Sequence, residues 1–332
     1  MKIVGFGDFL IHFSPIDCER FLQAEMMRMS FTGAEANVCA ALALWGESVQ
    51  FVSKVPEHAL AKKGLMFLNG LGVGTDGVQS GSGRMGLYFL EKGYSLRPSS
   101  VIYDRQHTLF AESVFEEYDW DSVLAGADAF YLSGITPSLS EPLFVCCQKL
   151  LPYVRAKGIP VFFDVNLRPT ICDIHRSREI FAALSPYITN LIGNEEHLKQ
   201  LLSLSPTESE ADDRLYAFVK QVRETTAIGQ VAVTVRRTHS ASRAEVYAAY
   251  GNGESTAISG HRIIDVVDRV GSGDAFSAGT VYATLHGFSA KETVDFATAA
   301  NALKHTVNND ILFATVEEIR GIMSQKSNDV KR

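Results

Sequence analysis

The chain has 332 residues, enough to bury a large core in one or two domains, and its apolar content of 46% is ordinary for a globular protein. It carries 31 basic and 38 acidic side chains, and the resulting net charge of −7 argues against bulk electrostatic binding to nucleic acid or to an anionic membrane. No apolar run is long enough to span a membrane, the start MKIVGFGDFL resembles a first strand more than a signal peptide, and five cysteines without a CxxC pair are typical of reduced thiols, so we expect a cytoplasmic protein.

Short apolar, β-branched runs recur along the chain, and most of them end in Gly, Asp or Asn. Continuous runs of this kind suit strands that are buried on both faces of a sheet. In chain order they are KIVGFG (2–7), VQFVSKV (49–55), DAFYLSG (128–134), PVFFDVN (160–166), ITNLIGN (188–194) and QVAVTV (230–235).

Helical patterns lie between these runs, and Gly46 and Gly158 stand where helix C-caps belong. Strands that alternate with helices predict an α/β fold, a three-layer α/β/α sandwich with a mostly parallel central sheet. The helical segments are EANVCAALALWG (35–46), EPLFVCCQKLLPYVRAKG (141–158), RLYAFVKQVRETTA (214–227) and AKETVDFATAANALKHT (290–306).

Two segments do not follow this alternation of buried strands and helices. Residues 9–32 fit no single buried strand, and residues 80–115 alternate between apolar and turn-forming residues. We interpret both as antiparallel strands that stand apart from the main sheet as a small lid. One α/β domain over residues 1–325 then contains both insertions, a polar loop occupies 203–213, and 326–332 form a flexible tail.

The pattern G-x-G-x-x-G occurs twice, in GVGTDG (72–77) and GSGRMG (81–86). A dinucleotide site needs these glycines after a strand and at the start of a helix. The first match follows a helical segment and the second leads into a strand, so neither context fits. A nicotinamide-dependent oxidoreductase therefore remains only a distant alternative.

The stretch DRVGSGDAF (268–276) follows a strand-like IIDVV and opens an apolar helical run. A helix N-terminus presents unpaired N–H groups, and glycines let phosphate oxygens approach the backbone closely. We therefore predict an anion hole made by Gly271, Ser272, Gly273 and Asp274. Asp274 either caps the helix or accepts a proton from an attacking hydroxyl group.

This stretch resembles the C-terminal signature D-T-x-G-A-G-D-x-F of the ribokinase-like carbohydrate kinases, the PfkB family. TGAEANVCAALALWG (32–46) resembles the family's N-terminal G-G-x-x-x-N-x-A element, with Thr32 in place of the first glycine. The resemblance implies a ribokinase-like sandwich with a β lid and transfer of the ATP γ-phosphate to a sugar hydroxymethyl group. It also implies that Asp274 is the catalytic base and that Gly33 and Asn37 contact the sugar; a helix-interior amide is the alternative for Asn37.

Within the family, GAEANV, GLYFLEKG, RPSSVIYDR, FDVNLRP, IGNEEHL and DRVGSGDAF resemble 2-keto-3-deoxygluconate kinases. A sugar acid needs a carboxylate partner, and arginine supplies a planar fork for bidentate binding. The resemblance implies that the substrate is contacted by Tyr88, Tyr103, Arg105 and Arg168. The alternatives are ordinary strand aromatics and surface ion pairs, with Asp164 as a partner for Arg168.

For the nucleotide, the resemblance places Thr234 and Arg236 near the phosphates or ribose and Asn301 near the adenine. Magnesium should bridge the phosphates with few protein ligands. The family often carries N-x-x-E where this chain has Asn194, Glu195, Glu196 and His197. We therefore expect the metal ligands to be Asn194 with one of the adjacent glutamates, Glu196 before Glu195, or mainly phosphate and water, and we expect His197 to be an exposed helix residue.

These features predict an ATP- and Mg²⁺-dependent kinase that forms the 6-phosphate of 2-keto-3-deoxygluconate. The alternatives are a fructokinase or another neutral-sugar kinase of the same fold and, more distantly, a non-catalytic sugar-binding regulator. The expected partners are a small sugar acid and ATP. A lid of two strands would leave exposed edges, which favours a homodimer formed through the lid.

Overall fold

The computed structural model describes residues 1–204 and 211–324. Its centre is a ten-stranded sheet in the order β15-β14-β13-β12-β11-β10-β1-β4-β6, with β16 also paired to β14. The strands are β1 (Lys2–Phe6), β4 (Ser48–Val52), β6 (Val73–Gly74), β10 (Ala129–Ser133), β11 (Val161–Asp164), β12 (Asn190–Asn194), β13 (Gln230–Ser240), β14 (Arg243–Gly251), β15 (Thr256–Ile258) and β16 (Arg262–Asp265).

Every pairing from β13 to β6 is parallel, whereas β14 pairs antiparallel with β13, β15 and β16. The six apolar runs of the sequence all form strands of this sheet, so the predicted α/β class with a mostly parallel sheet is confirmed. The carboxyl ends of the parallel strands meet at one edge, where open α/β sheets bind ligands. The strand before the anion hole is shorter than expected, because β16 ends at Asp265 and residues 266–270 form a loop.

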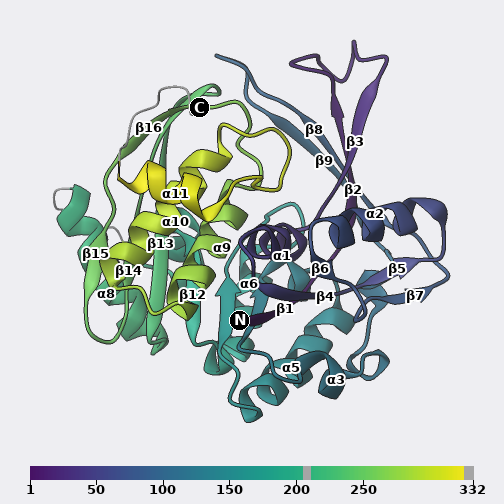
Figure 1. Cartoon of the computed structure of the whole chain (residues 1–332), viewed down its shortest axis with the longest axis horizontal. Helices are drawn as coiled ribbons and strands as arrows, with labels where there is room; N and C mark the ends of the chain where they lie inside the picture. Colours follow the sequence, from purple (N-terminus) through teal and green to yellow (C-terminus); the bar gives the residue numbers. More distant parts are fainter. Residues whose placement is uncertain (205–210, 325–332) are drawn as a thin grey trace.

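Helices cover both faces of the sheet (Figure 1). One face carries α1 (Ala34–Leu44), α2 (Ala59–Gly70), α9 (Ser272–Leu285), α10 (Ala290–Lys304) and α11 (Val316–Met323). The other carries α3 (Trp120–Leu124), α5 (Glu141–Ala156), α6 (Ile174–Leu184), α7 (Glu195–Leu202) and α8 (Ala211–Thr226). Short segments complete the set: α4 (Ile135–Ser138), η1 (Phe110–Glu112), η2 (Phe115–Glu117) and η3 (Ser185–Tyr187).

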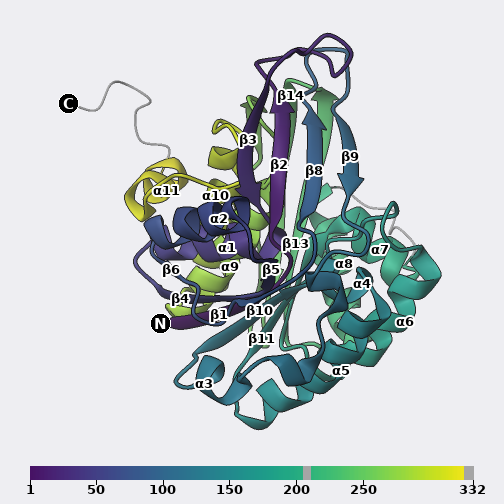
Figure 2. The ribbon, with the colours of Figure 1, turned by 90° about the vertical axis from the view of Figure 1, so that its right-hand side faces the viewer.

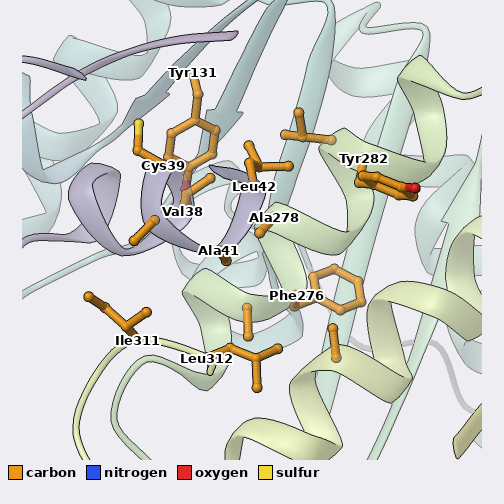
Figure 3. Packing of buried hydrophobic residues seen from close by; sticks show 14 of the residues in the cluster. Val38, Cys39, Ala41, Leu42, Tyr131, Phe276, Ala278, Tyr282, Ile311 and Leu312 are labelled. Atoms are coloured by element: carbon orange, nitrogen blue, oxygen red, sulfur yellow. The ribbon is translucent and has the colours of Figure 1, made fainter. Parts of the chain in front are cut away.

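Alternation along each strand divides the core between these two faces. On β10, Tyr131 packs toward α1 and α9, while Phe130 and Leu132 pack toward α5. Figure 3 shows the first of these two cores, where side chains of α1 and α9 meet Tyr131 and the segment at Ile311. This packing fixes the N-terminal ends of α1 and α9, which both reach the functional cleft.

A separate four-stranded sheet rises from the sandwich as a lid (Figure 2). Its order is β3-β2-β8-β9, so the lid has four strands and not two. The prediction that all its strands are antiparallel is wrong for the central pair: β2 and β8 are parallel, because residues 9–32 and 80–115 both leave the sandwich in the same direction. The strands are β2 (Leu10–Pro15), β3 (Met27–Thr32), β8 (Gly86–Glu91) and β9 (Ser100–Asp104).

The tip of the lid contacts the hairpin of β13 and β14, which rises beside it in Figure 2. There Ser95 donates its N–H to Ser242 and accepts from the N–H of Ala241. A small parallel pair, β5 (Lys54–Pro56) with β7 (Gln79–Gly81), lies below the lid. No described helix is long and apolar enough to cross a membrane.

Several local predictions can be compared with this fold. Gly46 and Gly158 have φ values of +90° and +77°, as the predicted helix C-caps require. The first G-x-G-x-x-G match spans β6 and the second runs from β7 to β8, and neither opens a helix. Most of the predicted 203–213 loop and the whole 326–332 tail lie outside the described residues, although 211–213 begin α8.

Candidate active site

A cleft of about 910 Å³ lies between the lid and the carboxyl ends of the parallel strands. Its walls come from both ends of the chain, from Leu10 in the lid to His305 after α10. All the residues predicted to serve the site line this one cleft: Gly33, Asn37, Tyr88, Tyr103, Arg105, Arg168, Asn194, Glu196, Thr234, Arg236, Gly271, Ser272, Gly273, Asp274 and Asn301.

The N-terminus of α9 opens into this cleft. Its N-cap, Gly271, has a φ of +77°, and a Cβ at this position would lie only 1.8 Å from the carbonyl oxygen of Asp310. Glycine is therefore required both by the backbone conformation and by the neighbouring chain. The N–H groups of Gly273 and Asp274 have no hydrogen-bond partner in the described part of the chain, so they are available to an anion.

Asp274 does not cap its helix, because no side chain caps the N-terminus of α9. Its Oδ2 instead accepts a hydrogen bond of 2.7 Å from Nδ2 of Asn37 on α1. The hydroxyl of Thr32 donates to Oδ1 of Asn37, which fixes the amide with its NH₂ group toward the carboxylate. Thr32, which replaces a family glycine, thus orients the amide. Gly33 approaches Asp8 so closely that a Cβ would lie 2.1 Å from its carbonyl oxygen.

Burial raises the pKa of Asp274 to about 7, and the nearby Asp164 carboxylate acts in the same direction against the hydrogen bond from Asn37. Asp164 ends β11, and burial raises its pKa to about 6. It accepts from Ser277 of α9 at 2.9 Å and from the N–H of Asn166 at 3.1 Å. A carboxyl group with a pKa near 7 suits general-base chemistry at neutral pH.

The two arginines predicted for the sugar differ in their surroundings. Arg105 follows β9 and is buried, and its Nη2 lies 2.8 Å from the Asp8 carboxylate, which is also buried. Arg168 donates to the carbonyl of Leu167, and its guanidinium has no ion pair within residues 1–204 and 211–324; in particular, Asp164 does not hold it. Arg168 is therefore the more available cation for a bound carboxylate.

Tyr88 of β8 and Tyr103 of β9 form the inner wall of the lid. Their rings stack with centroids 5.4 Å apart, and Arg105 lies 5.8 Å over the ring of Tyr103. Burial raises the pKa of Tyr88 well above its usual range, so its hydroxyl stays protonated. The pair offers flat surfaces with hydroxyl groups, which suits a sugar under the lid.

On the opposite side of the cleft, α10 presents polar atoms without partners. Thr298 Oγ1, Asn301 Oδ1 and His305 Nε2 are buried and unsatisfied within the described residues, and all three residues line the cleft. Nδ2 of Asn301 donates to the carbonyl of Ser272 at 2.8 Å, so Asn301 also steadies the anion-hole loop. Such unsatisfied groups point to a polar ligand on this side.

The predicted metal residues are mostly engaged elsewhere. Asn194 caps α7 by accepting from the N–H of His197, and Glu196 is largely exposed beside Lys199 at 3.3 Å. Glu195 is buried and paired with Arg214 at 2.6 Å. No group of three His, Cys, Asp or Glu side chains suited to a metal occurs in the described residues.

The expectation that His197 is exposed is wrong. It is half-buried on the cleft wall, because its side of the first turn of α7 faces the cleft, whereas the neighbouring Glu196 faces the solvent. Burial and the neighbouring charge of Arg168 lower its pKa to about 4, so the imidazole is neutral at pH 7.

Sequence reasoning missed four residues in or next to this site. Asp8 lies two residues after the end of the first strand, and a polar residue near a strand's carboxyl end was the available signal. Thr298 and His305 share a helix face with Asn301, and their i, i+3 and i+7 spacing could have drawn attention to them. Arg269, which also lines the cleft, stands two residues before Gly271 of the anion hole.

A carboxylate with a raised pKa beside the free N–H groups of a helix, under a β lid, defines a phosphotransferase that acts on a small alcohol. The family model for pfkB family carbohydrate kinases matches residues 1–316, and the chain belongs to this family. It is therefore a carbohydrate kinase. Its ribokinase-like fold agrees with the sequence-based expectation.

Several relatives share nearly the whole chain. A 2-dehydro-3-deoxygalactonokinase of Haloferax volcanii is 28% identical over 97% of this chain and 96% of its own length. A 2-dehydro-3-deoxygluconokinase of Bacillus subtilis is 25% identical over 94% and 91%. The crystal structure of a 2-dehydro-3-deoxygluconokinase from Thermotoga maritima matches with a TM-score of 0.95 and 34% identity over 98% of both chains. The chain is thus related to kinases named for 2-dehydro-3-deoxy sugar acids.

Proposed function

We propose that this kinase transfers the γ-phosphoryl group of ATP to the terminal hydroxyl of a 2-dehydro-3-deoxy sugar acid, with 2-dehydro-3-deoxygluconate (2-keto-3-deoxygluconate) as the first candidate. The galactonate epimer is the second candidate, because the Haloferax volcanii relative is named for it. The observation that carries the proposal is the unpaired guanidinium of Arg168 in the same cleft as Asp274. A neutral sugar would leave this cation without a partner.

The residues present fit ATP. The unpartnered atoms of Thr298, Asn301 and His305 suit the base or ribose, and Thr234 and Arg236 of β13 lie on the same side of the cleft. The N–H groups of α9 suit a phosphoryl group. When bound, ATP with its Mg²⁺ supplies the phosphoryl group and neutralises its charge. Because Asn194 and Glu195 are already engaged, we propose that the metal is held mainly by phosphate oxygens and water.

The chain's residues then have separate roles in the reaction. Arg168 binds the sugar carboxylate, and the Asp8–Arg105 pair and the lid tyrosines orient the sugar beneath the lid. Asp274 accepts the proton of the sugar's terminal hydroxyl. At the same time the hydroxyl oxygen forms the new bond to the γ-phosphorus, and the bond from this phosphorus to the oxygen of the leaving ADP breaks. The N–H groups at Gly273 and Asp274 stabilise the charge on the moving group.

A substrate panel tests this assignment. ADP release is measured with 2-dehydro-3-deoxygluconate, its galactonate epimer and neutral ketoses such as fructose, for the wild type and for Arg168→Met. We expect the wild type to prefer the acids, and Arg168→Met to raise KM for them by about 10–100-fold, because a hydrogen bond to a charged group is lost. The neutral sugars are the internal control. An equal loss on neutral sugars, or a wild type that prefers fructose, contradicts the assignment.

The pKa of Asp274 makes activity depend on pH. The base works only when ionised, so kcat/KM should fall about tenfold per pH unit below pH 7. Asp164→Asn removes a neighbouring negative charge and should move this acidic limb to lower pH. The pKa of the nucleotide phosphates would not change in this variant. If the acidic limb of the pH profile stays in place in Asp164→Asn, a group other than Asp274 therefore controls it.

We also propose a homodimer formed through the lid. The outer face of the lid carries a cross-strand apolar row of Met29, Phe13, Phe89 and Ile102. The rings of Phe13 and Phe89 stack 5.5 Å apart, and Ile102 is 52% exposed. An apolar sheet face of this kind is suited to burial against a second copy.

A further inference from the structure

We propose that the buried hydrogen-bonded pair of His12 and Asp310 couples the sugar side of the cleft to the anion hole, so that a bound sugar organises the N–H groups that receive the phosphoryl group. This inference rests on the proposed function. His12 and Asp310 would then be positioning residues, because neither lines the cleft.

The pair joins two distant parts of the chain. His12 lies on β2 of the lid and Asp310 on the loop between α10 and α11. Nδ1 of His12 is 3.0 Å from Oδ2 of Asp310, and the exposed fractions of the two side chains are 0% and 1%. Although burial opposes ionisation, the hydrogen bond and charge of His12 hold the pKa of Asp310 below its ordinary value. The pair is therefore a buried hydrogen-bonded link between lid and body.

Each end of this link touches a different half of the site. The imidazole of His12 lies 4.5 Å, between centroids, from the ring of Tyr88, which lines the cleft under the lid. The main chain of Asp310 lies against Gly271, where even a Cβ would be 1.8 Å from its carbonyl oxygen. A shift of the lid strand is therefore transmitted, through one hydrogen bond and one van der Waals contact, to the N-cap of α9.

Stability alone does not account for this pair. Burying an ionised carboxylate costs desolvation energy that a single partner often fails to recover. Here Nε2 of His12 also lacks a partner in the described residues, which adds to the cost. The lid has other anchors, such as the hydrogen bond of Ser95 to Ser242 and the ion pair of Lys92 with Asp268 at 3.0 Å.

The test is the thermodynamic coupling between the two ligands. The Kd of a non-hydrolysable ATP analogue is measured by calorimetry with and without saturating sugar acid, and the reciprocal experiment must give the same factor. In the wild type we expect the sugar to tighten nucleotide binding by about 5–150-fold. Asp310→Asn, which keeps the shape and removes the charge, should reduce this factor toward 1.

His12→Gln is a second variant with the same expectation, in case Asp310→Asn does not fold. Ser242→Ala is the matched control: it removes a lid contact away from Gly271 and should keep the wild-type coupling factor. Thermal melts show which variants are folded. Coupling that survives in both Asp310→Asn and His12→Gln, or a factor of 1 in the wild type, overturns the inference. If the wild type binds no sugar acid, the proposed substrate is wrong. The same binding measurements are then repeated with the sugar that the substrate panel identifies.

Discussion

Asp274→Asn should lower kcat by about 10²–10⁴-fold while the protein still folds, because the variant keeps the shape of the side chain and loses the proton acceptor. The asparagine oxygen can still accept the hydrogen bond from Asn37, so the N-terminal ends of α1 and α9 should stay together. Steady-state kinetics with the preferred sugar measures the effect. Near-wild-type kcat would show that Asp274 is not the base.

The same variant makes a second, opposite prediction for stability. The native carboxyl group binds its proton more tightly than the unfolded chain does, so the wild type loses stability as pH rises from about 4 to about 7. Asparagine has no such penalty, and at pH 8 the ligand-free variant should melt about 1–3 °C above the wild type. At pH 4 the difference should vanish. A lower melting temperature at pH 8 would mean that the loss of activity reflects damage to the fold.

Gly271→Ala should lower kcat/KM by about 10²–10³-fold, the loss expected when an anion-hole donor is displaced. The variant must place a Cβ 1.8 Å from the carbonyl oxygen of Asp310 at a φ of +77°, so the loop has to move. Backbone strain of this kind costs about 1–3 kcal/mol, and we expect stability to fall together with activity. Kinetics and thermal melts on the same sample measure both.

Gly287→Ala is the control for this variant. Gly287 also has a positive φ, +69°, but nothing lies within 4 Å of the position of its Cβ, and it stands at the far end of α9. It should lose stability through backbone strain alone and keep full activity. Wild-type activity in Gly271→Ala would mean that the N-terminus of α9 does not hold the phosphoryl group.

The sequence was sufficient for features that depend on neighbours along the chain. Buried strands appear as continuous apolar runs, because a parallel strand covered on both faces needs apolar side chains at every position, and β1, β10 and β11 follow this pattern. The prediction of an anion hole rests on the same kind of local relation, since Gly271 and Asp274 lie within one turn at the start of the same helix. Local spacing fixes such relations before any tertiary contact forms.

The tertiary structure alone decided which distant residues meet. The Asp8–Arg105 pair joins residues 97 positions apart, and the pair of His12 with Asp310 spans 298. Nothing local distinguishes Arg105, whose charge Asp8 compensates, from Arg168, which has no ion pair among the described residues. The parallel pairing of β2 with β8 was missed for the same reason. The relative direction and register of two strands from separate segments depend on how the chain crosses the sandwich, and the local sequence pattern does not determine this.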